Sequence, residues 1–447
     1  MRRVDPAIAV LALAGGLAAL VGALGGDLRW AVALGDAIVR TGHIPNGIPF
    51  SSAATHGWPN VPVLGEVVLG RVYAVAGERG LLVLQVAAVV AALEVLRRTM
   101  RARGASPGGA AAALALLFVG AFPSFVVVRL QLFSLVPFAV LVAVLAAPRP
   151  STRALRALPV LFLVWSNLHG GVLVGLAVLA TFALFRLRTD RLPLVVCAAS
   201  ALAACVTPAL WRTPAYYYGV ATSVAARRHV ELWAPLSPTR GFDAILAVCA
   251  LALAVAAFRG ARGRWELVAV CVLGAATIHT ARTGVWLLMF ASVPAAAGLP
   301  RLAPLRARLR PSAQFGLAAA GAMLALVGLV RGPSSFAATT PLVAQARTLA
   351  AGTPILADGV LGEQLALSGA RIWVGEPLDA FPAADQRLYL DWSDGAPQGD
   401  RALAYAPRVV LSLRRSASAK RLARDGGFRL CARDARALLF VRRGVAC

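Results

Sequence analysis

Long apolar runs alternate with short polar stretches along most of the chain. A membrane-spanning helix needs about 20 mostly apolar residues, or slightly fewer where flanking side chains reach the interface. On that criterion the sequence predicts eleven spans, in a mainly α-helical polytopic membrane bundle. The spans are expected near residues 7–25, 80–96, 108–123, 130–147, 157–167, 170–186, 192–209, 242–258, 265–280, 283–299 and 313–331. The fifth is too short to cross alone and meets the sixth at residues 167–171, which is compatible with a broken or re-entrant pair.

Beyond about Ser334 the pattern changes to short, alternating signals in a polar background. Strand-like and helix-like runs follow one another, and glycine-containing turns separate them. This favours a small α/β domain over residues 334–447, after a transmembrane domain over residues 1–333 whose first outer loop is residues 26–79. The strand signals are residues 353–358, 370–375, 406–413, 428–433 and 437–443, and the helix signals are 362–369 and 418–427.

Composition and charge agree with a membrane protein. The 447 residues are 59% hydrophobic with a formal charge of +25, and the mean hydropathy is +0.73. Basic residues are nearly all arginine and gather between apolar runs, which indicates topology determinants and argues against a nucleic-acid partner. Putting the N-terminus in the cytoplasm makes every inner loop short and basic, and it places the C-terminal domain outside the bacterial cytoplasmic membrane. The arginine clusters are at residues 2–3, 97–103, 149–156, 186–191, 259–264 and 301–310.

The same topology predicts different polar residues on the two faces of the membrane. The predicted outer face holds most of the polar groups suited to catalysis, while the inner face offers little besides arginine. Any chemistry is therefore expected outside the cytoplasm. The outer groups include His43, His56, His169, His229, His279, Asp27, Glu66, Arg129, Asn167, Glu231, Asp243 and Arg282.

The first outer loop is the longest polar interruption before the tail, and long loops in compact proteins are usually functional. Its apolar positions between Leu28 and Val39 predict a helix lying flat on the membrane, which Gly42 ends. Asp27 begins this helix. It is either an N-cap that accepts from backbone N–H groups or a general base that takes a proton from a hydroxyl acceptor.

Several of these stretches resemble a bacterial group of membrane proteins similar to GT-C glycosyltransferases, which use polyprenyl-phosphate sugars. The resemblance rests on Asp27-Leu28-Arg29-Trp30 with Gly35, Ile38, Gly42, Ile44-Pro45 and Pro49-Phe50-Ser51; on Arg129-Leu130-Gln131-Leu132-Phe133-Ser134; on Trp165-Ser166-Asn167-Leu168-His169-Gly170-Gly171; and on Glu231-Leu232-Trp233-Ala234-Pro235. It extends over essentially the whole chain, and the Asn-Leu-His-Gly-Gly string is its most specific part.

The chain departs from the group's pattern at several polar positions. Ala31 stands where a histidine is usual, Ile48 where an aspartate is usual, and Val61-Pro62 where a His-Glu pair is usual. An Asp-Gly-Arg is usual near Gly375-Glu376-Pro377. Asp27 and Glu66 are retained.

Other outer residues have both a structural and a functional interpretation. Asn167 and His169 either form a polar clasp between helices or line a cavity that binds sugar or lipid phosphate. The arginines near the outer helix ends either snorkel to the interface or neutralise a phosphate leaving group. The candidate substrate-binding residues are Arg129, Asn167, His169, Arg227, Glu231, His279, Arg282 and Glu66, and the candidate catalytic residue is Asp27.

The resemblance implies a glycosyltransferase that moves a sugar from a polyprenyl-phosphate donor to an acceptor on the outer side. The alternative is a non-catalytic relative that has a structural or lipid-handling role, and a transporter is the third hypothesis. A divalent metal is compatible with the outer carboxylates and histidines, but no spacing forms a metal motif. Cys431 and Cys447 are placed to form a disulfide if the tail is extracytoplasmic.

Overall fold

A computed structural model describes residues 5–302, 311–335 and 341–447. Internal contacts divide the chain into two compact units. The helical unit comprises Met1–Ala23, Ala76–Trp211 and Glu231–Pro333, and the mixed unit comprises Leu24–Val75, Arg212–Val230 and Ser334–Cys447. The arginine cluster at 2–3 and its counterpart within 303–310 lie outside the described residues.

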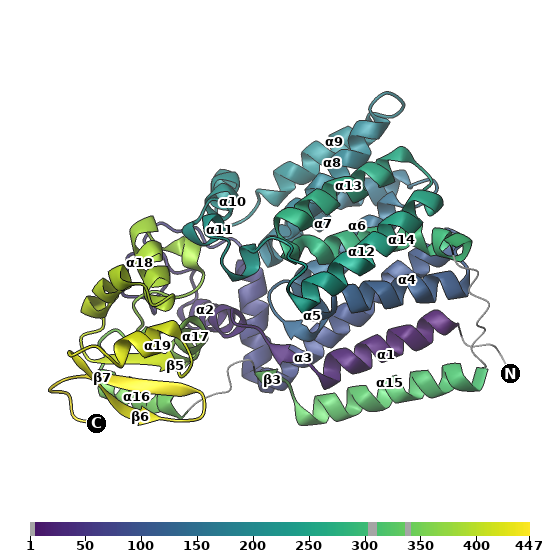
Figure 1. Cartoon of the computed structure of the whole chain (residues 1–447). Coiled ribbons are helices and arrows are strands. Elements are labelled where there is room, and N and C mark those ends of the chain that lie inside the picture. Colours follow the sequence, from purple (N-terminus) through teal and green to yellow (C-terminus); the bar gives the residue numbers. More distant parts are fainter. Residues whose placement is uncertain (1–4, 303–310, 336–340) are drawn as a thin grey trace. The chain divides into compact units, whose positions relative to one another are not determined.

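The helical unit consists of long helices joined by short connections (Figure 1). The helix α3 (Val63–Ala102) begins in the mixed unit and continues into the helical unit after a break at Gly77. The other elements are α1 (Pro6–Leu20), α4 (Pro107–Gly120), α5 (Phe122–Val126), β2 (Val127–Val128), α6 (Leu132–Leu145), α7 (Thr152–Leu168), α8 (Val172–Arg186), α9 (Leu192–Ala204), η2 (Glu231–Trp233), α12 (Gly241–Gly260), α13 (Arg264–His279), η3 (Ala281–Thr283), α14 (Gly284–Leu302) and α15 (Pro311–Arg331); β1 (Ala23–Leu24) and η1 (Leu210–Arg212) lie at the unit boundaries.

A helix occupies each of the eleven predicted ranges, so the mainly helical class with several apolar helices is confirmed. Four helices in the described part of the chain are long and apolar enough to cross a membrane, and the number of crossings stays a prediction. The fifth predicted span is longer than expected, because α7 starts at Thr152, where the Ser151 hydroxyl accepts from the Ala154 N–H at 3.1 Å. Ser151 thus caps the helix and adds a turn before the apolar run.

Small residues let the helices of this unit pack closely. The helices α1 and α15 lie side by side along their length (Figure 1). A methyl group on Gly321 would collide with the backbone of Ala12, and one on Gly328 with the backbone of Ala19. The pair α12 and α14 depends in the same way on Gly260. Such contacts replace the hydrophobic driving force that lipid does not provide between helices.

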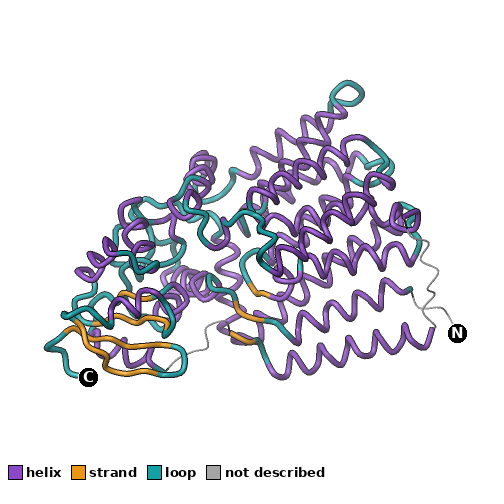
Figure 2. Tube along the Cα trace, viewed as in Figure 1, coloured by secondary structure: helices purple, strands orange, loops and turns teal. Residues whose placement is uncertain are grey.

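The mixed unit contains the longer strands of the chain, shown as orange tubes in Figure 2. Its helices are short and its segments come from three separate parts of the sequence. Its elements are α2 (Leu28–Thr41), α10 (Thr213–Ala221), α11 (Val224–Arg227), β3 (Ser334–Ser335), α16 (Leu342–Ala350), β4 (Leu356–Ala357), α17 (Gly359–Leu367), η4 (Leu378–Ala380), α18 (Ala383–Ser393), η5 (Pro397–Tyr405), β5 (Val409–Leu413), α19 (Ala417–Leu422), β6 (Phe428–Arg433) and β7 (Ala437–Arg442).

The sheet of this unit has the order β4-β5-β7-β6. β4 and β5 are parallel, with Leu356 opposite Val410, and β7 is antiparallel to both of its neighbours. Ile372 extends the sheet beyond β4 through parallel bridges to Ile355 and to Ser51. The first loop therefore forms part of the same β structure as the C-terminal segment.

A single hydrophobic core holds the loop and the C-terminal segment together. Trp30 and Leu34 of α2 are buried among residues of β4, β5 and α17, and Trp30 meets Phe50 edge-on at 4.6 Å between ring centroids. Each fully buried large apolar side chain contributes roughly 1.5–3 kcal/mol. The apolar stripe expected to rest on the membrane is instead buried in protein. Gly42 ends α2 as predicted, at a φ of 71°, which glycine adopts without strain.

Cys431 and Cys447 are joined in a disulfide, with Cα atoms 5.6 Å apart. That separation is ordinary for such a bond. The bridge ties the C-terminal residues to β6, the edge strand of the sheet. The other four cysteines are unpaired, and among them Cys249 is buried and Cys271 exposed.

Candidate functional site

Asp27 stands at the N-cap position of α2, but its side chain makes no capping hydrogen bond. Glu363 of α17 takes that role, because its Oε2 accepts from the backbone N–H of Arg29 at 3.2 Å and its carboxyl group also receives the Trp30 N–H. These are the second and third N–H groups of the helix, the ones an N-cap side chain normally satisfies. The capping interpretation of Asp27 therefore loses its main support.

The Glu363 carboxyl group and the Arg29 guanidinium lie close together, buried beneath this helix end. Their Oε1 and Nη1 atoms are 3.8 Å apart, and the side chains are 2% and 3% exposed. Burial raises the pKa of Glu363 to about 8, against the opposing effect of the Arg29 guanidinium, and the charge of Asp27 raises it further. A carboxyl group of this kind stays largely protonated near neutral pH.

This shift predicts a pH dependence of stability. The unfolded chain releases the Glu363 proton near 4.5 and the folded protein near 8. The folded state therefore holds the extra proton between these values, and raising the pH through that window lowers the free energy of unfolding. We expect the thermal midpoint of the full-length protein to fall from about pH 5 to about pH 8.

The variant Glu363→Gln tests the assignment, because glutamine keeps an oxygen for the two N–H groups and cannot titrate. We expect a flatter midpoint-against-pH curve, with a residual slope of the same sign from Glu66, Asp358 and Asp379, whose pKa values burial also raises. The exposed Asp394→Asn is the matched control and should leave the curve unchanged. An identical slope in wild type and Glu363→Gln contradicts the prediction.

Glu66, at the start of α3, is part of a second polar cluster in the mixed unit. Its Oε2 accepts from Asn60 Nδ2 at 2.5 Å, and both residues are buried. Gly35 explains how α2 approaches this point, because a methyl group there would collide with the Glu66 backbone. The Asn60 Oδ1 atom is buried without a hydrogen-bond partner. Such an atom usually marks a place for water or a ligand group.

Asp379 and Tyr216 complete this cluster. The Trp58 indole donates to Asp379 Oδ2 at 3.2 Å, and the Trp58 ring lies 6.3 Å from that of Tyr216. Burial raises the pKa of Tyr216, and the charges of Asp379 and Glu66 raise it further. The cluster of Trp58, Asn60, Glu66, Tyr216 and Asp379 thus places two acids and a phenol where they interact electrostatically.

In the helical unit, the turn between α7 and α8 holds Asn167 and His169. Asn167 Nδ2 donates to the carbonyl oxygens of Leu163 at 2.9 Å and Val206 at 2.7 Å. It thereby ties the end of α7 to the segment after α9. Both amide hydrogens are used, which favours the clasp interpretation for this end of the side chain and leaves Oδ1 for a ligand.

His169 ends a chain of hydrogen bonds that begins at Trp165. The Trp165 indole donates to Ser134 Oγ at 2.6 Å, and Ser134 Oγ lies 2.7 Å from His169 Nδ1, which also accepts the Gly171 N–H at 3.0 Å. Nδ1 is therefore an acceptor, and the ring proton belongs on Nε2. Gly171 is required here, because a methyl group would collide with Ser134 Oγ. This accounts for the conjunction of Trp, His and Gly in the sequence string.

In the helical unit, the segment around Trp233 contacts the segment around Arg282. The Ala281 N–H donates to the Ala234 carbonyl at 3.1 Å, so η2 and η3 lie side by side. The Arg282 guanidinium stacks on the Trp233 ring, 3.8 Å from its centroid. Trp233 therefore stabilises the position of the Arg282 guanidinium through a cation–π contact. His279 is exposed at the end of α13, and the side chain of Glu231 lies outside what the structure describes.

The remaining candidates lie at or just beyond the ends of short elements. Arg129 follows β2 and is half-buried, while Arg227 ends α11 and is exposed. The neighbouring Arg228 is engaged with Asp391 at 2.8 Å. Within the mixed unit lie Asp27, Glu66 and Arg227; within the helical unit lie Arg129, Asn167, His169, His279 and Arg282.

Sequence reasoning missed the partners of these residues. Glu363, Asn60 and Asp379 are far from Asp27 and Glu66 in the sequence or lack any motif, and Ser134 appeared only as part of a longer string. The one available signal was that Glu363 lies on a helix-like run in a polar tail. Among the described residues, no group of three His, Cys, Asp or Glu side chains is arranged to hold a metal ion.

No family model matches the sequence, and no curated protein sequence matches it either. Solved structures do. ArnT from Cupriavidus metallidurans bound to undecaprenyl phosphate matches with a TM-score of 0.51 at 14% identity, over 97% of each chain, and its apo form matches with a TM-score of 0.52 over the same shares. This chain has a GT-C-like fold. Arabinofuranosyltransferase AftD from Mycobacteria matches with a TM-score of 0.53 at 16% identity, over 97% of this chain and 41% of that one.

The GT-C-like fold extends over both units, because the matches to ArnT cover nearly the whole length of each chain. Together with the apolar helices, it makes the chain a multi-pass membrane protein. At these identities the likeness concerns the fold. It assigns no role to any individual residue of this chain.

Proposed function

We propose that this protein transfers a sugar from a polyprenyl-phosphate donor to a hydroxyl acceptor on the outer side of the bacterial cytoplasmic membrane. The observation that carries the proposal is the fold match over 97% of both chains to ArnT, which was captured with undecaprenyl phosphate. A polyprenyl chain is an apolar ligand, and a helical membrane bundle offers it a suitable environment.

Asp27 is the proposed general base. Glu363 satisfies the helix end that Asp27 would otherwise cap, which supports a role for Asp27 other than capping. In the reaction the acceptor oxygen attacks the anomeric carbon of the sugar, and the bond from that carbon to the phosphate oxygen breaks. The acceptor proton goes to Asp27, and polyprenyl phosphate leaves with the bonding electrons.

The leaving phosphate needs positive charge. Arg129, Arg282 and Arg227 are proposed for this role, since arginine binds phosphate oxygens in a bidentate manner. Trp233 supports Arg282 by holding its guanidinium flat against the indole. Asn167, His169, His279, Glu231 and Glu66 are proposed to position the sugar and acceptor.

The orientation belongs to the proposal as well. We place the N-terminus in the cytoplasm and the C-terminal domain outside. The Cys431–Cys447 disulfide supports this orientation, since such bonds persist in oxidising compartments.

A transfer assay tests the function. The full-length protein is reconstituted in proteoliposomes with labelled polyprenyl-phosphate-linked sugars and a panel of hydroxyl acceptors. We expect label on the acceptor together with release of polyprenyl phosphate, and no transfer from the corresponding sugar nucleotide. If no donor sugar gives either labelled acceptor or free polyprenyl phosphate, the result counts against the proposal.

A non-catalytic, lipid-handling role is the second candidate. It is favoured by Ile48 and Val61, which stand where the group that this sequence resembles usually carries polar residues and which are only 4% and 1% exposed. Saturable binding of polyprenyl phosphate without any transfer would support this role.

A further inference from the structure

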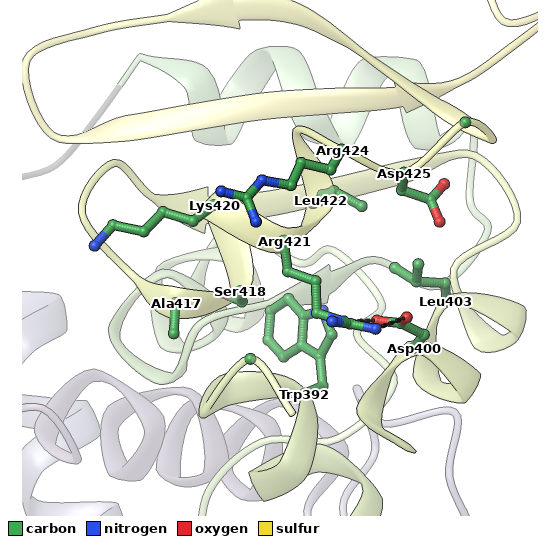
Figure 3. A pocket seen from close by; sticks show the side chains of 12 residues that line it. Trp392, Asp400, Leu403, Ala417, Ser418, Lys420, Arg421, Leu422, Arg424 and Asp425 are labelled. Atoms are coloured by element: carbon green, nitrogen blue, oxygen red, sulfur yellow. Dashed lines mark hydrogen bonds and ion pairs between the residues drawn. The ribbon is translucent and has the colours of Figure 1, made fainter. Parts of the chain in front are cut away.

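The C-terminal segment contains a pocket that none of the proposed catalytic residues lines. Its volume is about 470 Å³, within the range of small-ligand sites. It lies between the end of α18, the 3-10 helix η5 and α19 with the turn that follows (Figure 3). All of its lining residues fall between Trp392 and Gly426, within the mixed unit.

Two glycines bring the walls of this pocket together. Gly395 has a φ of 70°, and a methyl group there would lie 2.8 Å from Ala417 Cβ. A methyl group on Gly399 would collide with the Trp392 backbone. The segment from α18 to η5 can therefore fold tightly against α19, with Trp392 at the base of the hollow.

The lining is rich in cations that are not all neutralised within the protein. Arg421 donates two hydrogen bonds of 2.5 Å, from Nε and Nη2, to the Asp400 carboxylate. Figure 3 shows this pair beside the Trp392 ring. Asp425 accepts the Gly427 N–H at 2.8 Å. Among the described residues, the exposed side chains of Lys420 and Arg424 make no hydrogen bond or ion pair.

We propose that this pocket binds a saccharide that carries a negative charge, either a carboxylate or a phosphate. Lys420 and Arg424 would hold the charged group, and the Arg421–Asp400 pair presents fixed polar atoms to the hydroxyls. The partly exposed side chain of Leu403 offers apolar contact to the C–H face of a sugar ring. Trp392 and Leu422, which are 4% and 3% exposed, support the wall beneath it. The site goes beyond the proposed transfer reaction, and binding is measurable without any donor lipid.

Binding is tested on the full-length protein in detergent by isothermal titration with four probes: an oligogalacturonate trisaccharide, glucose 6-phosphate, inorganic phosphate and neutral maltotriose. We expect one or both charged saccharides to bind at least tenfold more tightly than maltotriose and inorganic phosphate. Preference for the first probe identifies a carboxylate ligand and preference for the second a phosphate. Equal binding of maltotriose, equal binding of inorganic phosphate, or no binding of either charged saccharide overturns the proposal.

Charge reversal locates the site. Lys420→Glu with Arg424→Glu should weaken binding of the charged saccharide at least tenfold, since both side chains are exposed and are not needed for folding. The matched control is Arg414→Glu with Arg433→Glu, which makes the same charge change at exposed positions outside the pocket. Equal losses in both double variants would show a general charge effect and overturn the assignment.

Lys420 also allows a test without substitution, because it is the only lysine in the chain. Bound saccharide should slow acylation of its amine by an N-hydroxysuccinimide ester, as followed by mass spectrometry of the peptide. The α-amino group provides an internal reference whose rate should not change. Unchanged acylation of Lys420 at saturating saccharide contradicts the proposed site.

Discussion

Asp27→Asn is expected to lower the rate of sugar transfer by about 10²- to 10⁴-fold, the usual contribution of a general base. Asparagine has nearly the same shape and keeps an oxygen that can accept hydrogen bonds, but it cannot take the proton of the acceptor hydroxyl. Glu363, and not Asp27, receives the N–H groups at the start of α2, so the variant keeps the capping hydrogen bonds of this helix. Initial rates in proteoliposomes, measured with one donor and one acceptor, give the comparison.

The matched control lies on the same helix. Asp36 is 48% exposed and pairs with Arg40, so Asp36→Asn removes an equal charge without touching the helix start and should retain the wild-type rate. A pH–rate profile adds a second readout, since loss of a base removes the acidic limb of the profile. Wild-type turnover in Asp27→Asn would falsify the base assignment while leaving the fold and the membrane character untouched.

Arg103→Met is expected to destabilise the helical unit by about 3–5 kcal/mol, because it leaves a buried carboxylate unpaired. Arg103 Nη1 and Nη2 contact Glu266 Oε1 and Oε2 at 2.5 and 3.0 Å, and the two side chains are 4% and 3% exposed. Arg103 also donates to the Ala146 carbonyl at 2.8 Å. The pair therefore fastens the end of α3 to α13 and to the residue after α6.

The double variant Arg103→Met with Glu266→Leu separates pairing from packing. Replacing both charges by apolar groups of similar size is expected to recover much of the loss, since no buried charge then remains. Thermal unfolding and the monodisperse fraction in detergent measure both variants. The matched single variant is Arg98→Met, whose side chain is 76% exposed and whose loss should cost under about 1 kcal/mol. Equal midpoints for Arg103→Met and Arg98→Met would contradict the argument.

The pair of Arg103 and Glu266 shows what a local sequence pattern does not predict. In the sequence, Arg103 belongs with Arg97, Arg98 and Arg101 to one cluster between apolar runs, and such a cluster predicts only the orientation of the neighbouring helices. Its burial depends on Glu266, which is 163 residues away. Nothing in the local pattern distinguishes a solvated arginine from one that is paired inside the protein.

The same contrast holds at the candidate site. The helix over 28–41 and its end at Gly42 could be predicted, because apolar periodicity and the left-handed preference of glycine are local properties. The distant side chains that bind the start of α2 and Trp58 could not be predicted. Glu363 reaches α2 from 334 residues away, and Asp379 reaches Trp58 from 321 residues away.

The sequence by itself determined the class of the protein: apolar runs long enough for membrane helices, arginine between them, and a polar tail with strand and helix signals. These follow from transfer free energies and short-range backbone preferences, which act residue by residue. Only the tertiary structure decided that the first loop shares a core with the C-terminal segment, that Glu363 caps α2, and that Arg103 is buried. Those outcomes depend on which distant groups meet when the chain packs, because a buried polar group is stable only beside a partner that local sequence does not specify.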